Sequence, residues 1–351
     1  MIQRGIATFT LDYGKCPQNY SRIKNKIPKE PQIPLKNYLL DLISESDNKK
    51  SSIYLIGVEK FIKEIWEEIT RHNPRTLKVK VLIPQNFRIH HMTFYHYKNG
   101  KKAIPLHIFY KLLELWKQYC PKNNREFKRK WEEIYRSNFY FSSSRRYPLI
   151  IPPKYINPQL SYLIGWICGD GNFNNYNNHY LIKISEKSII QLNYILSPLF
   201  NILFNAQPKL YHIYKGGYAL QLNSKPVFRF FTQVLKIRVG EIPELVFNLD
   251  EINKRYFLAG VFDSEGFVSK NRYKITISQA KIEFLVGLLQ LFSLFKIKFN
   301  GPTQHTTKLG TWYSIRLEKK SEIVKFYNII GSYHVEKLPK IKAMISKIKY
   351  L

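Results

Sequence analysis

The chain has 351 residues, 44% of them hydrophobic, and a formal net charge of +31 at pH 7. This length and hydrophobic fraction are enough for two domains with cores, and they exclude a largely disordered chain. The basic excess is spread over both halves of the chain. A polyanion would relieve the self-repulsion, and nucleic acid is a better candidate than a membrane surface.

The N-terminal residues, 1–145, predict a basic, mainly helical domain. Residues 1–50 are rich in Lys, Pro and Asn and show little periodicity, whereas residues 53–70 and 105–120 have the spacing of amphipathic helices. In the second of these helices the apolar side chains share one face: Leu106, Phe109, Leu112, Leu113 and Trp116. A basic stretch with Ser and Pro over residues 121–150 predicts a domain boundary, which we place after residue 145.

Within this domain, residues 85–120 resemble a helix-turn-helix module, with residues 92–106 at its recognition-helix end. In that interpretation a short helix would enter a DNA groove through Thr93, Tyr95 and His96. Lysines that follow it would hold phosphates: Lys98, Lys101 and Lys102. The upstream helix is poorly supported, because residues 79–83 are β-prone and Pro84 interrupts. The alternative is a basic helical domain without a specified role.

The second half of the chain contains an internal repeat. Residues 163–171, LIGWICGDG, match residues 258–266, LAGVFDSEG, with 95 residues between equivalent positions. Each nonapeptide is followed by strand-like segments, a helix, a hairpin and another helix. Gly216-Gly217 marks the first hairpin, and Tyr273, Ile275 and Ile277 alternate with polar residues in the second unit. This alternation predicts antiparallel sheets with a dry face packed on helices and a cationic outer face.

Each nonapeptide carries small residues four positions apart, namely Gly165 and Gly169, then Gly260 and Ser264. Such residues share a helix face, so two helices could approach backbone to backbone. Each stretch then ends with an acid and a glycine, and we expect the glycine to form a left-handed cap.

The two acids are Asp170 and Glu265. A carboxylate at a helix C-terminus faces the negative end of the helix dipole, and two such groups side by side would repel each other. Divalent cations would neutralise them, and Mg²⁺ (or Mn²⁺) suits an oxygen-rich site because it keeps waters and binds phosphate oxygens. The alternative is two apolar helices packed through small residues with exposed terminal acids, which two copies of the pattern make the weaker interpretation.

The paired nonapeptides resemble the signature motifs of LAGLIDADG homing endonucleases in their monomeric, two-motif form, over residues 155–349. The resemblance implies an α+β fold, a pseudo-two-fold αββαββα repeat over residues 146–250 and 251–351. Two saddle-shaped antiparallel sheets would lie over the DNA major groove. It further implies metal-dependent phosphodiester hydrolysis that makes a double-strand break at a long site in double-stranded DNA, as in intron homing.

The resemblance places Asp170 and Glu265 at the metal-binding positions, and we include Gly169 and Ser264, directly before them, in the predicted metal site. Cys168 departs from the motif, which often carries an acid there, whereas the second copy keeps Asp263. Neither residue is required for metal binding in the family.

The family also usually places a basic or polar residue near each metal site. Residues 331–337 resemble the segment that supplies a lysine, so Lys337 is the predicted catalytic lysine. In the first repeat Glu241 stands where Lys or Arg is expected, with Lys236 or Arg238 as weak substitutes. This asymmetry predicts unequal cutting of the two strands. Glu186 and Gln279, at strand ends, either support the site or are ordinary surface residues.

DNA contacts are predicted from the polar faces of the strands. The residues on these faces are Lys183, Lys274, Thr276 and Arg316, and those near turns are Lys215, Lys270 and Arg272. Arg and Lys in a groove read guanine edges or hold phosphates, and phosphate neutralisation makes binding salt-dependent.

Two other functions use the same features. An intron RNA maturase would bind intron RNA through the same basic, aromatic-rich surface, and a catalytically inactive regulator would bind DNA alone. Retention of both acids favours the nuclease. Widely spaced cysteines, the lack of a long apolar run and the lack of a signal-peptide pattern predict an intracellular, cytoplasmic protein without a membrane segment.

Overall fold

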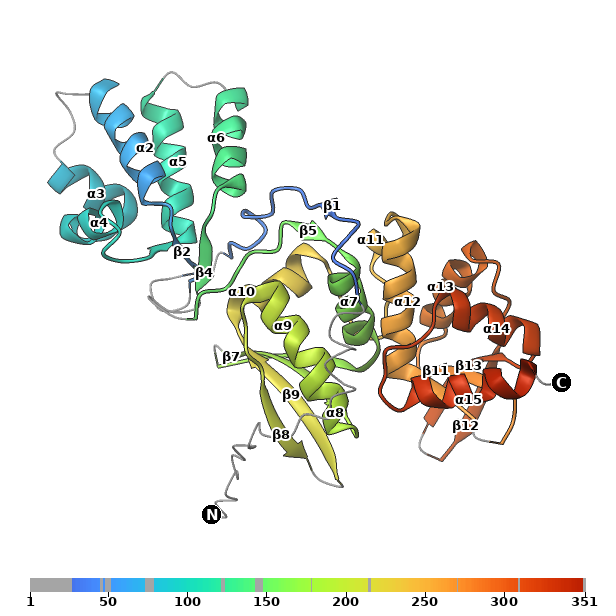
Figure 1. Cartoon of the computed structure of the whole chain (residues 1–351). Helices are drawn as coiled ribbons and strands as arrows, with labels where there is room; N and C mark the ends of the chain where they lie inside the picture. The colour runs from blue at the N-terminus through green and yellow to red at the C-terminus, as the bar shows by residue number, and fades with distance from the viewer. Residues whose placement is uncertain are drawn as a thin grey trace, which may run out of the picture.

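The computed structural model describes residues 27–44, 47, 52–72, 79–120, 124–142, 148–177, 179–213, 216–269, 271–308 and 310–349. The chain forms an N-terminal, mainly helical unit and two similar α+β units, as Figure 1 shows. The predicted fold class is confirmed. None of the helices in the described ranges is both long and apolar enough to span a membrane.

The N-terminal unit packs its helices beside a small sheet of strand order β3-β2-β4. Its elements are β2 (Tyr54–Ile56), α2 (Glu59–His72), α3 (Val79–Phe87), α4 (His91–Lys98), β3 (Ile104–Pro105), α5 (Leu106–Tyr119), α6 (Asn124–Arg136) and β4 (Tyr140–Ser142). The helix predicted over residues 105–120 is confirmed as α5, whose predicted apolar face is buried. The helix predicted over residues 53–70 begins only at Glu59, because residues 54–56 pair with β3 and β4.

The β-prone interpretation of residues 79–83 was wrong, because they belong to α3 and Pro84 lies inside this helix. Ile83 and Phe87 are buried, and the Phe87 ring stacks on Phe94 of α4 at 5.9 Å. A proline in a helix interior costs about 3 kcal/mol. Burial of one large apolar side chain contributes about 1.5–3 kcal/mol, so tertiary packing outweighs the local preference.

The two repeats share one order of elements. The first comprises α7 (Pro158–Asp170), β6 (Gly171–Tyr176), β7 (His179–Glu186), α8 (Ile189–Gln191), η1 (Leu192–Leu196), α9 (Ser197–Phe204), β8 (Lys209–Ile213), β9 (Gly217–Asn223), α10 (Lys225–Arg229), η2 (Phe230–Val234) and α11 (Glu244–Phe247). The second comprises α12 (Glu251–Glu265), β10 (Gly266–Val268), β11 (Ile275–Gln279), α13 (Ile282–Leu294), β12 (Asn300–Thr307), β13 (Gly310–Leu317), α14 (Lys320–Ile329) and α15 (Lys337–Lys349). A short ladder of β1 (Ile33–Pro34) with β5 (Tyr155–Ile156) leads into the first repeat.

Both large sheets are antiparallel, with orders β6-β7-β9-β8 and β10-β11-β13-β12. Their registers are equivalent, since Gly171 pairs with Ile184 in one and Gly266 pairs with Ile277 in the other. Ile184 and Ile277 are buried, so these positions and every second residue from them face the helices. The residues between them form the opposite face, called here the outer face of each sheet.

The helices α7 and α12 pack against each other at the centre of the two repeats (Figure 1). Gly165 and Gly260 lie at this crossing. A Cβ on Gly165 would lie 2.8 Å from the Val261 backbone nitrogen, and one on Gly260 would lie 3.1 Å from the Trp166 nitrogen. The predicted backbone-to-backbone approach is therefore confirmed.

The glycines after the two acids do not form left-handed caps, so that expectation was wrong. Gly171 has φ −73° and Gly266 has φ −79°, both extended, because each helix runs directly into a strand. Glycine is needed for space instead. A Cβ on Gly171 would lie 2.9 Å from the Ile167 Cα, and one on Gly266 would overlap the Phe262 ring.

We predict that Gly165→Ala destabilises the fold by about 2 kcal/mol, the usual cost of overpacking. Helix propensity alone would give the opposite sign, since Ala is favoured over Gly by about 1 kcal/mol in a helix. Gly287→Ala in α13 is the matched control, because the nearest atom to its Cβ is the flexible end of Ile242. Urea unfolding measures both variants. A stabilised Gly165→Ala would contradict the close helix crossing.

Candidate active site

The helix crossing brings two carboxylates together, because Asp170 is the last residue of α7 and Glu265 the last of α12. Burial and the nearby charge of Asp170 raise the pKa of Glu265 to about 8. Burial also raises the pKa of Asp170, with Glu186 acting in the same direction and Lys337 opposing. The pair is therefore an unfavourable concentration of negative charge at the negative ends of two helix dipoles.

Each acid has a neighbour at the end of the adjoining strand. Gln279, which ends β11, donates from Nε2 to Glu265 Oε1 at 3.0 Å. Glu186 ends β7 and occupies the equivalent register position in the first repeat. It is a third carboxylate beside Asp170, where the second repeat has a neutral amide. The two polar strand-end residues therefore lie at the site but differ in charge.

Lys337 binds the C-terminal end of α12. Its Nζ donates to the carbonyl oxygens of Phe262, Asp263 and Ser264 at 3.3, 2.7 and 3.1 Å. Burial lowers the pKa of Lys337, while the surrounding carboxylates, including Asp170 and Glu265, act in the opposite direction. The predicted lysine thus lies beside both acids.

Among the described residues of the first repeat, no lysine takes the equivalent place. Gly331 and Lys236 both have left-handed backbone, with φ 70° and 53°, and lie 95 positions apart. With the same spacing of 95, Ile242 is the residue of the first repeat that is equivalent to Lys337. Lys236 and Arg238 are exposed, and Glu241 pairs with Lys281 at 2.8 Å. The end of α7 is instead bound by a backbone N–H, since Gly240 N donates to Cys168 O at 2.7 Å.

Asp263, which the motif comparison treated as dispensable for metal binding, is fully buried and joins several elements. It accepts hydrogen bonds from the Tyr162 hydroxyl at 2.8 Å, the Ser332 hydroxyl at 2.5 Å and the Tyr333 backbone nitrogen at 2.7 Å. Asp263 therefore fixes α12 to α7 and to the segment that leads to Lys337. Cys168, its counterpart, is also buried and its pKa is raised by burial.

His334 is a site residue that the sequence reasoning missed. Its Nδ1 accepts from the backbone nitrogens of Glu336 and Lys337 at 3.1 and 3.4 Å. The ring proton therefore lies on Nε2, which is 3.5 Å from Glu186 Oε2. This buried imidazole connects β7 of the first repeat to the start of α15. A lone histidine three positions before Lys337 carries no periodic signal, and only its packing identifies it.

Comparison with known proteins finds a family model that matches part of the chain. The model of the LAGLIDADG-like domain matches residues 253–331. The predicted resemblance is confirmed for this second repeat, and the first repeat has the same order of elements around α7.

Two curated relatives come from Methanocaldococcus jannaschii. A glutamine–fructose-6-phosphate aminotransferase is 27% identical over 63% of the chain, and an uncharacterized protein is 27% identical over 46%. The chain spans 20% of the length of the first and 57% of the second. Among solved structures, the homing endonuclease I-DmoI covers 53% of this chain and 97% of its own, at 17% identity and a TM-score of 0.42. The match to full-length DUF199/WhiA from Thermatoga maritima covers 54% of this chain and 60% of that protein, at 19% identity and a TM-score of 0.39.

The donor set at the ends of α7 and α12 fits a hard divalent cation with open coordination positions. In the described ranges no three His, Cys, Asp or Glu side chains form a closed metal cage. Mg²⁺ is usually held by one or two carboxylates with water and phosphate oxygens completing its shell, which the Asp170–Glu265 pair allows. Gly169 and Ser264 lie against each other between the helices, where a Cβ on Gly169 would overlap the Ser264 hydroxyl.

Some of the predicted DNA-contact residues lie on the outer faces of the sheets, and others lie beside the strands or in the N-terminal unit. Lys183 of β7 and the cross-strand neighbours Thr276 and Arg316 lie on the outer faces. Lys274 directly precedes β11 and lies 3.8 Å from Glu318, and Arg272 is exposed in the segment before it. Lys215 and Lys270 lie outside the described residues. Lys98, Lys101 and Lys102 lie at and after the end of α4, in the N-terminal unit.

We predict that ionisation of Glu265 destabilises the metal-free protein. Because its folded-state pKa is about 8, above the usual value of 4.5, the folded state holds the proton more tightly than the unfolded state. Stability from this group is therefore present below about pH 4.5 and is lost as the pH rises towards 8. In EDTA at pH 8, Glu265→Gln should be more stable than the wild type by on the order of 1–3 kcal/mol, and the gain should shrink at pH 5.

Urea unfolding at the two pH values measures this difference, with Glu283→Gln, an exposed substitution in α13, as the control. Mg²⁺ should stabilise the wild type and leave the Asp170→Asn/Glu265→Gln variant unchanged, because a ligand stabilises only the state that binds it. A gain that does not vary with pH would argue against close contact of the acids.

Proposed function

We propose that this protein is a site-specific homing endonuclease that makes a double-strand break in DNA by metal-dependent phosphodiester hydrolysis. The observation that carries the proposal is the meeting of Asp170 and Glu265 at the ends of two crossing helices. This arrangement is unfavourable in the free protein and becomes favourable when cations and a phosphodiester are present. Functional sites commonly keep such locally costly charges.

In this proposal Asp170 and Glu265 hold Mg²⁺ or Mn²⁺. A divalent cation bound there supplies an activated water and charge stabilisation for the leaving oxygen. Gln279 orients Glu265 through its amide hydrogen bond. Lys337, whose ammonium is fixed by three carbonyl oxygens, stabilises the negative charge that develops on the phosphate. Its position against rigid backbone means that little reorganisation is needed during the reaction.

Double-stranded DNA would lie against the outer faces of the two sheets. Each repeat, residues 146–250 and 251–351, would bind one half of a long site, and one copy of the chain would suffice because it contains both halves. Cationic side chains on the faces, together with the net charge of +31, would provide much of the affinity through phosphate contacts. Lys337 has no counterpart among the described residues of the first repeat, and Glu186 occupies the position that Gln279 has in the second. Both differences support unequal rates of cleavage of the two DNA strands.

We predict that the wild type with Mg²⁺ linearises a plasmid carrying the uninterrupted form of the locus that holds its gene. Asp170→Asn and Glu265→Gln should each reduce cleavage at least 100-fold, because each removes a metal-binding charge, while Glu283→Gln keeps it. Gel analysis of nicked and linear plasmid over time measures both steps, and unequal sites should produce a nicked intermediate. Specific DNA binding without cleavage would identify a regulator, and stimulation of intron splicing alone would identify a maturase.

We propose that the N-terminal unit, residues 1–145, contacts DNA through a helix-turn-helix over residues 85–120. Three residues separate α3 from α4, and Arg88 among them has φ 51°. Phe94 and Tyr97 hold α4 to the core, while Met92 and Tyr95 are 45% and 48% exposed. Of the residues predicted to enter the groove, Tyr95 is exposed, and Thr93 and His96 are half-buried. The exposed face of α4 and the lysines after it would form the contact.

We predict that alanine substitution of Lys98, Lys101 and Lys102 together weakens DNA binding. Loss of three phosphate contacts should reduce the slope of log affinity against log salt by about 3. The control is alanine substitution of three exposed residues of the same unit and charge, Arg125, Lys128 and Arg129 of α6. Fluorescence anisotropy over a salt series measures the slopes. Equal effects of the two triple variants would dismiss the helix-turn-helix contact.

A further inference from the structure

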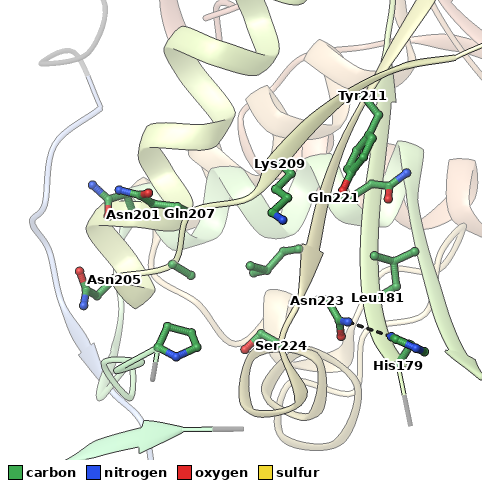
Figure 2. Close-up of a pocket in the computed structure, with 13 residues that line it drawn as sticks. His179, Leu181, Asn201, Asn205, Gln207, Lys209, Tyr211, Gln221, Asn223 and Ser224 are labelled. Atoms are coloured by element: carbon green, nitrogen blue, oxygen red, sulfur yellow. Dashed lines mark hydrogen bonds between the residues drawn. The ribbon is translucent and has the colours of Figure 1, made fainter. Parts of the chain in front are cut away.

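The outer face of the first sheet continues into a cavity of about 660 Å³ at the end of α9, shown in Figure 2. Six strand residues that line it alternate with the buried core residues: His179, Leu181, Lys209, Tyr211, Gln221 and Asn223. Asn201, Asn205 and Gln207 line it from the end of α9 and the segment after it. The remaining lining residues are Pro148, Ala206, Leu222 and Ser224. Five of the thirteen lining side chains are carboxamides, so the lining contains many groups that both donate and accept hydrogen bonds.

Several of these amides are available to a ligand. Asn223 contacts His179 at 3.0 Å and accepts from the Tyr180 nitrogen, and Asn205 donates to Leu149 O at 2.9 Å. Across the described part of the chain, the side-chain amides of Asn201, Gln207 and Gln221 have no hydrogen-bond partner. Gln221 lies in the middle of the sheet, directly opposite Lys183 on one side and Lys209 on the other.

The second sheet places different chemistry at the same positions. Since Gly171–Ile184 and Gly266–Ile277 are equivalent pairs, continuing each ladder makes Gln221 equivalent to Arg316. A neutral amide in the middle of the first sheet is thus replaced by a cation in the second. At the start of the second strand the sheets differ, because β7 begins at His179 whereas β11 begins only at Ile275.

These differences correspond to different bases in a major groove. A carboxamide pairs with adenine N6 and N7, an arginine pairs with guanine O6 and N7, and an apolar side chain contacts the thymine methyl. Leu181 lies directly opposite Asn223 in the ladder, so one A·T pair could meet both an amide and an apolar group. Lys183 and Lys209, next to Gln221, are suited to phosphates.

From this contrast we propose that the DNA target is asymmetric in composition. The half bound by the first repeat is A·T-rich, with an adenine contacted by Gln221, and the other half has a guanine contacted by Arg316 at the mirrored position. The proposal rests on the proposed DNA-binding function and adds the class of sequence that each repeat recognises.

The test selects bound duplexes from a random library with the full-length protein in EDTA, so that cleavage plays no part. The wild type should select a site with one A·T-rich half. Gln221→Arg should change one adenine to guanine in that half only, and Arg316→Gln should change one guanine to adenine in the other half only. Each preference should shift by about 10-fold or more, the discrimination of one bidentate contact. Thermal melting of each variant confirms that it is folded.

Three outcomes separate the possibilities. The paired shifts in opposite halves would support the proposal. Selective binding with two halves of equal composition, or with variants that lose affinity without changing base preference, would overturn it and leave DNA binding intact. Absence of any selected duplex would overturn the proposed site-specific DNA binding and this inference with it.

Discussion

The site depends on one contact, the backbone-to-backbone crossing of α7 and α12 at Gly165 and Gly260. At this distance no Cβ fits between the helices, so their C-terminal ends must lie close together. Asp170 and Glu265 then share one region although each alone would be an ordinary solvated acid. Each helix continues without a turn into a strand, at Gly171 and Gly266, so the same contact also sets where the two sheets begin.

The backbone is nearly symmetric around this crossing, whereas the side chains are not. Lys337 binds the end of α12, while a backbone N–H from Gly240 binds the end of α7. Gln279 donates to Glu265, while its counterpart Glu186 adds a negative charge beside Asp170. A repeated fold therefore supports two unequal half-sites, because register fixes positions and leaves side-chain identity free to differ.

The N-terminal chain is joined to the first repeat by buried charge. Asp47 accepts hydrogen bonds from Arg229 at 2.7 and 2.9 Å and from Lys225 at 2.7 Å, and all three side chains are almost fully buried. Removing one partner from such a cluster leaves an uncompensated buried charge, which is strongly destabilising. Residues before the first repeat are thus part of its folded structure. Deleting residues 1–145 would therefore also destabilise the first repeat.

The repeat, the strands and the two acids followed from the sequence, because each depends on local periodicity or on spacing that recurs after 95 residues. The same holds for α5, whose apolar face is periodic, and for the position of Lys337. Local preference failed where packing dominates: residues 79–83 form a helix around Pro84, residues 54–56 form a strand, and Gly171 and Gly266 are extended.

What the sequence by itself determined is the pair of motif helices and the acids that end them. Tertiary structure alone decided that His334 lies between Glu186 and Lys337 and that Asp263 is a buried link. It also decided between the two interpretations of Glu186, which lies beside Asp170. Glu186 and His334 are 148 positions apart, and Asp263 and Ser332 are 69 positions apart, so no periodic pattern reports these contacts. Their roles come from burial, where a polar group must find a partner, and burial is set only when the two repeats pack together.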